Sequence, residues 1–350
     1  MLFLIDVDTG DALIGYLVPD SLTEPGKYVI RANGEEVYRG ETDIEHPALV
    51  AVRRHETGRC GLHITEQQVP GLSQMQELDI VDLVTGQAIY RRRPLEDLVH
   101  KRVFRLETHL LPLSGLDRSI QSRFQLWFPH IDRTGYETTT QIFNQKSESV
   151  LVSGRVAYPT VEHLVSKGPY EPITIVHDPF DELAERLLFL RLAANRPGVL
   201  GERDNLMFTE TLAFAKEVNL DSGKNMRRIF STLDETVASR LANPLVRQLA
   251  TLDHGEPVVG SAVSKALSAL SGFAVVGIRR RPDLFVDALG EIVLDLEEHD
   301  VTVAPPIPAA TELADRLRDC PPVEDLLQYD LALYHIISDA FEKSLIQSYS

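Results

Sequence analysis

The segment Phe128–Thr140 carries residues suited to anion binding. It continues a short apolar run, Gln125–Phe128, and it places Arg133 and Gly135 just before a stretch with helical character. Free N–H groups at a helix N-terminus, the helix dipole and an arginine all favour a phosphate or sulfate group. The same pattern also fits an ordinary turn between a strand and a helix, with Thr138 as the cap of the helix.

Clusters of arginine offer further places for an anion. Arg227–Arg228 and Arg279–Arg281 could form basic pockets in a chain whose net charge is −17, although a solvated turn face is the ordinary explanation of such runs. The overall negative charge repels phosphate backbones and anionic lipid headgroups. We therefore expect no nucleic acid among the partners of this chain.

The cysteine count and the hydropathy pattern narrow the class of protein. The sequence contains two cysteines, Cys60 and Cys320, which excludes a disulfide framework and a cysteine-rich zinc site, so we expect no metal. The apolar run at the N-terminus is too short for a signal peptide, and no stretch approaches the roughly 18 apolar residues of a membrane span. These features predict a cytoplasmic protein without a transmembrane segment.

Residues 1–93 have the pattern of a small all-β domain. Short alternating apolar segments are separated by turn residues, and Asn33-Gly34 between two such segments indicates a hairpin with a type I′ turn. A second turn is expected at Thr85-Gly86. We predict an antiparallel β-sandwich of about six to eight strands, which include 27–32, 36–39, 61–64, 78–84 and 88–91.

The chain after residue 122 follows a different pattern. Strands alternate with helices, which predicts an α/β domain with a parallel sheet flanked by helices. We place a β-sandwich accessory domain at 1–112 and the α/β domain at 113–350. Apolar runs typical of buried parallel strands occupy 125–128, 172–176 and 273–277, and helical periodicity appears at 180–194, 206–218, 233–252, 282–296 and 323–349.

Six segments of the second domain occur in an order that can be compared with known proteins. The first three are Phe128–Thr140, Val152-Ser-Gly-Arg155 and 175–191, which contains His-Asp-Pro. The others are 243–249, 273–285 and 329–334. This order resembles that of the carbohydrate sulfotransferases, which use 3′-phosphoadenosine-5′-phosphosulfate (PAPS) and include heparan-type, chondroitin-type and bacterial enzymes. The resemblance covers 124–341 and implies a P-loop-NTPase-like, sulfotransferase-like fold.

The resemblance assigns the 5′-phosphosulfate of PAPS to the loop that follows the first apolar run. Asp132 and Tyr136 stand where the family has a proline and a second glycine, and a carboxylate and a ring at these positions weaken phosphate binding. PAPS is therefore implied as a co-substrate on a loop that departs from the family pattern. The implied ligands are Arg133, in place of the family's lysine, with Thr134, Gly135 and Thr138.

The 3′-phosphate side departs from the family as well. His177 stands at the position of the arginine that binds the 3′-phosphate, and Glu185 at the position of a serine on the following helix. Arg279 lies on the adenine and 3′-phosphate side of the implied site. Glu185 would repel a phosphate, and a neutral histidine binds one less strongly than an arginine does.

The catalytic base is also replaced. Arg155 stands at the position of the family's histidine, and an arginine cannot accept the proton of the acceptor hydroxyl. The base would then be His130, His163 or Glu162, and the sequence does not choose among them.

Two functions follow from these expectations. The first is a sulfotransferase that transfers a sulfuryl group from PAPS to a carbohydrate hydroxyl in bacterial polysaccharide biosynthesis. The second is a non-catalytic protein of the same fold that acts as a binding or assembly partner in polysaccharide production. A transferase with another donor is a third reading.

The N-terminal domain has a resemblance of its own. The segments 32–40, 47–49 and 58–64 are similar to a β-module of bacterial polysaccharide-synthesis glycosyltransferases. The expected partners are a carbohydrate acceptor or polysaccharide-synthesis proteins. The amphipathic segment 323–349 packs either on its own sheet or on a second subunit, so a homo-oligomer stays open.

Overall fold

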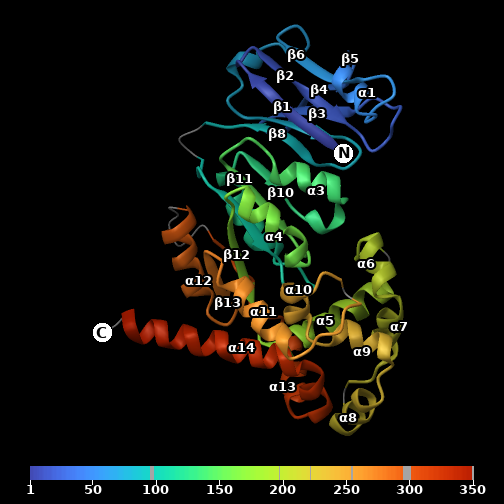
Figure 1. Cartoon of the computed structure of the whole chain (residues 1–350), viewed down its shortest axis with the longest axis vertical. Coiled ribbons are helices and arrows are strands. Elements are labelled where there is room, and N and C mark those ends of the chain that lie inside the picture. Colours follow the sequence, from blue (N-terminus) through green and yellow to red (C-terminus); the bar gives the residue numbers. More distant parts are fainter. Residues whose placement is uncertain (95–97, 197, 221, 254, 295–300, 349–350) are drawn as a thin grey trace. The chain divides into compact units, whose positions relative to one another are not determined.

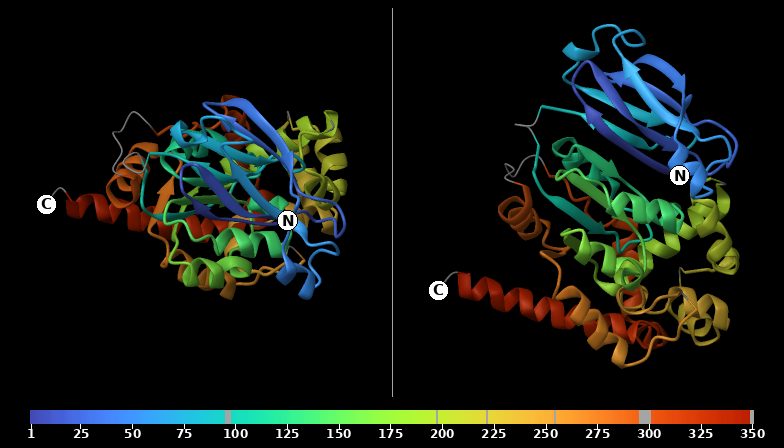
Figure 2. Two further views of the ribbon diagram at one scale, coloured as in Figure 1. Left: turned by 90° about the horizontal axis from the view of Figure 1, so that it is seen from above. Right: turned by 45° about the horizontal axis from the view of Figure 1, so that its top comes forward.

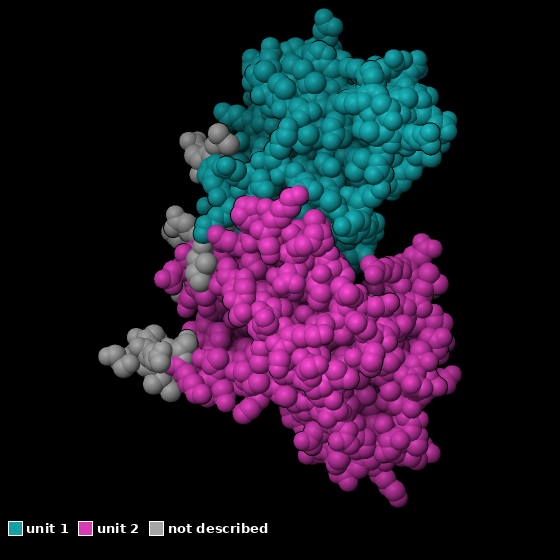
Figure 3. All heavy atoms as spheres, in the orientation of Figure 1, with its two compact units in different colours: residues 1–103, 120–152 teal, residues 104–119, 153–350 magenta. Residues whose placement is uncertain are grey.

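The computed structural model describes residues 1–94, 98–196, 198–220, 222–253, 255–294 and 301–348 (Figure 1). The chain divides into two compact units, coloured separately in Figure 3: residues 1–103 with 120–152, and residues 104–119 with 153–350. The expected boundary after residue 112 falls inside the segment 104–119, so each unit takes two stretches of the chain.

The N-terminal strands form two four-stranded antiparallel sheets, with orders β1-β2-β6-β5 and β4-β3-β7-β8. Asn33 and Gly34 have φ values of 50° and 83°, as the type I′ turn between β3 and β4 requires. The predicted antiparallel strands are confirmed. Their bounds are β1 Leu2–Asp8, β2 Ala12–Val18, β3 Lys27–Ala32, β4 Glu35–Glu41, β5 Ile44–Glu45, β6 Arg59–Thr65, β7 Leu78–Asp82 and β8 Ala88–Arg92, with the short helix α1 at Pro47–Ala51.

The remaining strands form a five-stranded sheet of order β10-β11-β9-β12-β13, and helices flank it (Figures 1 and 2). The pairs β10–β11 and β12–β13 are parallel. The predicted α/β arrangement with a parallel sheet is therefore confirmed, although two inner strands, β9 and β11, were not expected as strands. The bounds are β9 Arg102–Leu106, β10 Leu126–Phe128, β11 Val150–Gly154, β12 Glu171–Val176 and β13 Val275–Ile278.

Helices are found within the predicted segments 180–194, 282–296 and 323–349, whereas the helices at 114–120, 158–167, 223–231, 261–270 and 308–318 were not predicted. The single helix expected at 233–252 is two helices, because Asn243 has a left-handed φ of 46° and precedes a proline, which disfavours helical backbone. The helix expected at 206–218 is likewise divided, because it begins in α6 and continues as α7. The last two residues of the helix expected at 282–296 and the last residue of the helix expected at 323–349 lie outside the described residues. The bounds are α2 Ser114–Ile120, α3 Tyr136–Phe143, α4 Tyr158–Lys167, α5 Pro179–Asn195, α6 Glu202–Met207, α7 Thr209–Glu217, α8 Gly223–Ser231, α9 Glu235–Leu241, α10 Pro244–Ala250, α11 Ser261–Leu270, α12 Pro282–Leu289, α13 Pro308–Arg318 and α14 Pro321–Ser348.

Helix α5 begins directly after β12 and carries acidic residues into the interior of the second unit. Its N-cap, Asp178, accepts the N–H of Phe180 at 3.0 Å, and Pro179 supplies a first helical residue that needs no hydrogen-bond partner. An N-cap of this kind stabilises a helix by about 1 kcal/mol. The first two turns of α5 therefore lie at the carboxyl end of β12, with Glu182 and Glu185 buried.

None of the helices in the described part of the chain combines the length and the apolar character needed to cross a membrane.

Candidate functional site

The carboxyl ends of β9 and β12 are the place in the sheet where a ligand is expected. The chain leaves β9 for β10 and β11 on one side and continues to β12 and β13 on the other, so the strand order reverses between β9 and β12. Open parallel sheets bind ligands outside the carboxyl ends of their strands at such a reversal. The hydroxyl of Thr108 donates to the carbonyl of Ile175 at 2.6 Å and joins the two loops. The segments 107–113 and 177–182, both in the second unit, therefore form the candidate site.

Arg105 is the centre of a buried ion-pair network at the end of β9. Its guanidinium donates to the Asp117 carboxylate at 2.9 Å and to Glu107 Oε2 at 3.0 Å, and all three side chains are buried. The hydroxyl of Ser153 donates to the same Asp117 carboxylate at 2.7 Å. Burial alone would lower the pKa of Arg105, but the two carboxylates hold this pKa above its usual range. The Arg105 guanidinium therefore stays protonated and charged although it is buried.

The Glu107 carboxylate accepts hydrogen bonds from the backbone N–H groups of the loop that follows β9. Its carboxylate accepts the backbone N–H of His109 at 3.1 Å and of Leu113 at 2.7 Å, and it also contacts His109 Nδ1 at 2.8 Å. Burial by itself would raise the pKa of Glu107, but the Arg105 charge and the His109 hydrogen bond hold it well below its usual range. Loop N–H groups after a strand are what a bound phosphate uses. Here a carboxylate of the chain itself takes them.

Three residues predicted for the 3′-phosphate, His177, Glu185 and Arg279, come together in the structure. Arg279 Nη1 contacts His177 Nε2 and donates to Glu185 Oε2 at 2.7 Å. Its Nε and Nη2 donate to the carbonyls of Ala304 and Pro305, each at 2.9 Å. Arg279 is 4% exposed, so its donors are used inside the protein and Glu185 already supplies the anion.

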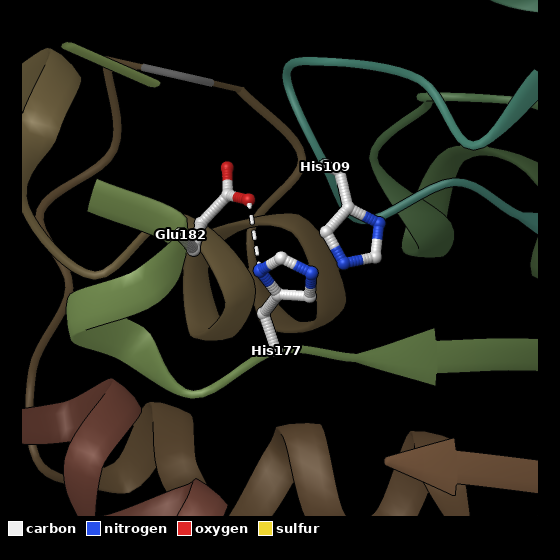
Figure 4. Close-up of side chains that lie close together, drawn as sticks. All are labelled: His109, His177 and Glu182. Atoms are coloured by element: carbon white, nitrogen blue, oxygen red, sulfur yellow. Dashed lines mark ion pairs between the residues drawn. The ribbon is translucent and has the colours of Figure 1, made fainter. Parts of the chain in front are cut away.

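Two buried histidines lie beside this cluster. The rings of His109 and His177 meet edge to face with centroids 4.0 Å apart, and His177 Nδ1 lies 3.9 Å from Glu182 Oε2 (Figure 4). Among the described residues, His109 Nε2 and His177 Nδ1 have no hydrogen-bond partner. Burial, His109 and the Arg279 charge lower the pKa of His177, so this ring is neutral. These three side chains could hold a metal ion.

The residues predicted for the 5′-phosphosulfate gather in the first unit, around a pocket of about 350 Å³. His130 has a left-handed φ of 54°. Thr138 is not the helix cap, because α3 begins at Tyr136 with Gly135 as its N-cap. The Tyr136 side chain is 67% exposed and does not line the pocket, contrary to the expectation that its ring would crowd a phosphate. The lining includes His130, Arg133, Thr134, Gly135 and Thr138.

The remaining predicted catalytic residues lie in the second unit, outside the buried cluster. Arg155 donates to Asp204 at 2.6 Å and lies 6.0 Å from the centroid of the Phe208 ring. His163 and Glu162 are exposed on α4. The predicted site residues are therefore divided between the two units of the chain.

A small pocket beside Arg155 is rich in arginine. Arg186 there donates to Glu182 at 2.9 Å and Arg247 to the carbonyl of Glu256 at 2.5 Å, whereas Arg240 Nε is buried without a hydrogen-bond partner among the described residues. Its volume of about 20 Å³ is the space that one water molecule needs, which is too small for a nucleotide. The arginines that line it are Arg155, Arg186, Arg240 and Arg247.

Sequence reasoning missed four residues of the cluster at β9 and β12, which are Glu107, His109, Asp117 and Glu182. The available signal was the run Glu107-Thr108-His109 directly after a strand, with Asp117 ten residues further on. That signal was not used, because the strand β9 contains two arginines and does not resemble an apolar run. Glu182 was treated as part of an amphipathic helix.

No model of a known protein family matches this chain, and no curated protein matches it either.

Two segments compared with the sulfotransferases, 243–249 and 329–334, meet in the second unit. Asn243 Oδ1 accepts the backbone N–H of Asp330 at 3.1 Å, and the Asp330 carboxylate accepts the N–H groups of Leu245 and Val246 at the start of α10. Burial raises the pKa of Asp330 to about 7, and these two N–H groups and the Arg186 charge offset part of that increase while the Glu182 charge adds to it. At neutral pH this carboxyl therefore exchanges a proton.

We expect the protein to lose stability as the pH rises from 5 to 8, and Asp330→Asn to remove most of this loss. The folded state holds the Asp330 proton up to a pKa of about 7, whereas the unfolded chain releases it near the ordinary value of 3.8, so stability falls between these values as pH rises. The linkage amounts to about 2–3 kcal/mol between pH 5 and 8. Urea unfolding of both proteins at several pH values measures it. An equal pH slope in both would contradict the assignment, whatever the absolute stability of Asp330→Asn.

Proposed function

We propose that this chain is a non-catalytic relative of the PAPS-dependent carbohydrate sulfotransferases, with a P-loop-NTPase-like α/β part, that acts as a binding or assembly partner in polysaccharide production. The observation that carries the proposal is the position of two internal carboxylates. Glu107 takes the loop N–H groups after β9, and Glu185 pairs with Arg279. A nucleotide phosphate would have to compete with both.

The electrostatics support the same proposal. A phosphate that entered the Arg279 site would displace a buried, charge-assisted hydrogen bond and leave the Glu185 carboxylate without its partner. An unpaired buried charge costs several kcal/mol, which exceeds what one added phosphate contact returns. We therefore expect PAPS to bind weakly or not at all in the second unit.

The pocket in the first unit favours a second candidate, PAPS-dependent sulfuryl transfer to a carbohydrate hydroxyl. Arg133 and the residues at the start of α3 line this pocket together, and this combination suits a sulfate or phosphate group. Of the three residues considered as the base, His130 lines this pocket, whereas Glu162 and His163 are exposed on α4. In this candidate His130 would take the proton of the acceptor hydroxyl as its oxygen attacks sulfur and the bond from sulfur to the bridging phosphate oxygen breaks.

The melting temperature of the full chain with 3′-phosphoadenosine-5′-phosphate distinguishes the two candidates. A ligand at about 100 times its Kd stabilises a protein by about 2.7 kcal/mol, which is easily seen as a shift. We expect no shift at millimolar ligand. A shift that disappears in Arg133→Ala but persists in the control Arg39→Ala, at an exposed arginine paired with Glu36, would establish the second candidate and overturn the first.

A further inference from the structure

We propose that His109, His177 and Glu182 bind a divalent transition metal, with Zn²⁺ as the best-suited ion, at the carboxyl ends of β9 and β12. This site is independent of the proposed function, because it requires neither PAPS nor a carbohydrate. It also departs from the expectation of a metal-free protein, which considered cysteine ligands alone.

The geometry of the three side chains fits a metal. One nitrogen of each histidine and a carboxylate oxygen of Glu182 lie within 4.8 Å of one another, and all three residues are buried. Zinc bonds to histidine and carboxylate are about 2.0–2.2 Å long, so tetrahedral ligand atoms lie roughly 3.4 Å apart. Metal binding therefore requires the three ligand atoms to lie closer together than the 4.8 Å within which they are found. Two histidines and a glutamate are an established zinc ligand set.

The unsatisfied nitrogens point to a missing partner. His109 Nε2 and His177 Nδ1 lack hydrogen-bond partners among the described residues, although the two rings are only 1% and 5% exposed. A buried polar atom without a hydrogen-bond partner destabilises the folded state, so protein interiors rarely keep two together. Both atoms belong to the triad in Figure 4, where a metal would satisfy them.

The neighbouring side chains orient the ligands. Glu107 accepts a hydrogen bond from His109 Nδ1 at 2.8 Å, which leaves the lone pair of Nε2 for a metal. Arg186 holds Oε1 of Glu182 at 2.9 Å and leaves Oε2 on the side of His177. A carboxylate behind a ligating histidine is a common arrangement in zinc sites.

His177 must lose a proton before it can bind a metal through Nδ1. Arg279 is a donor only, so its contact with Nε2 holds the proton of the neutral ring on Nδ1. Metal binding breaks this Nδ1–H bond, forms the bond from Nδ1 to the metal, and releases the proton to the buffer. The Arg279 guanidinium then lies against the negatively charged imidazolate. The carboxylates of Glu107 and Glu182 face the triad, and each is already paired with an arginine, Arg105 or Arg186.

The three ligands come from three separate segments of the second unit. His109 follows β9, His177 follows β12, and Glu182 lies in the first turns of α5, so one ion would join three segments of the second unit. A metal that binds the folded chain alone stabilises it and makes the melting temperature depend on metal concentration.

Metal content and thermal stability of the full chain test the site. The chain is stripped with a chelator and titrated with Zn²⁺, and the bound metal is measured by elemental analysis. We expect one equivalent per chain, a melting temperature higher by about 5 °C, and loss of both in His109→Gln. The control His163→Gln, at an exposed histidine on α4, should keep both.

Cobalt keeps the test decisive if His109→Gln fails to fold. Co²⁺ added to the stripped wild-type chain should give the visible spectrum of a tetrahedral nitrogen and oxygen site, and Zn²⁺ should abolish it. Absence of stoichiometric Zn²⁺ and of the cobalt spectrum would overturn the proposal, as would equal metal binding by His109→Gln and the wild type.

Discussion

Replacing Arg105 with methionine is expected to lower the free energy of unfolding by about 3–5 kcal/mol. The substitution keeps a similar length and apolar stem but removes the charge that balances Asp117 and Glu107. Both carboxylates would then be buried with no compensating cation, and breaking a buried ion pair from one side has this cost. Urea denaturation measures it as a lower midpoint at an unchanged slope.

The pH dependence of this loss identifies its cause. The pKa of Glu107 is depressed in the folded wild type, so its stabilising effect is complete above the unfolded value of 4.5 and is lost as the pH falls toward the folded value. The difference between wild type and Arg105→Met should therefore shrink below about pH 4.5. The control Arg39→Met removes an exposed ion pair with Glu36 and should change stability little. A similar loss in both variants would contradict the account.

Replacing Glu185 with serine is expected to have an effect of similar size. Arg279 and Glu185 are 4% and 1% exposed, so the substitution leaves a buried guanidinium without its carboxylate and costs about 3–5 kcal/mol. Glu185 also accepts the backbone N–H of Ile307 at 3.0 Å, which adds a smaller loss. Calorimetric melting of wild type and variant measures the difference.

Glu185→Gln serves as the matched variant, because it keeps the shape and one acceptor while removing the charge. It should lose less stability than Glu185→Ser but more than a surface substitution such as Glu36→Gln. If Glu185→Gln were as stable as the wild type, the Arg279–Glu185 pair would contribute no net charge interaction, and the internal anion would not explain this cluster.

The N-terminal sheets could be predicted from sequence because their information is local. Alternating segments joined by Asn33-Gly34 specify a hairpin without reference to the rest of the chain. The strand β12 and the helix α5 were predicted for the same reason, since the apolar run at 172–176 and the helical periodicity at 180–194 are both local patterns.

The inner strand β9 could not be predicted from local pattern. Its sequence, Arg-Val-Phe-Arg-Leu, looks half exposed, and yet Arg105 is buried because Asp117 and Glu107 neutralise it. That pairing depends on contacts the hydrophobic pattern does not contain. Because β9 was not predicted, the loop 107–113 that follows it was not recognised either. The sequence therefore did not show that the Glu107 carboxylate accepts backbone N–H groups of this loop.

The predicted site residues were partly grouped correctly. His177, Glu185 and Arg279 meet, as expected from their proposed common ligand, but the sequence could not show that they saturate one another. The opposite signs of Glu185 and Arg279 were the available hint. Two charges of opposite sign at one predicted anion site indicate an internal pair as readily as a ligand site.

Phosphate rescue of Glu185→Ser tests most directly the claim that an internal carboxylate occupies an anion-binding position. Inorganic phosphate at millimolar concentration, compared with chloride of equal ionic strength, should raise the melting temperature of Glu185→Ser, because an external anion replaces the missing carboxylate beside Arg279. The wild type should not respond, since Glu185 already occupies the position. An equal response of both proteins, or no response of the variant, would contradict the account.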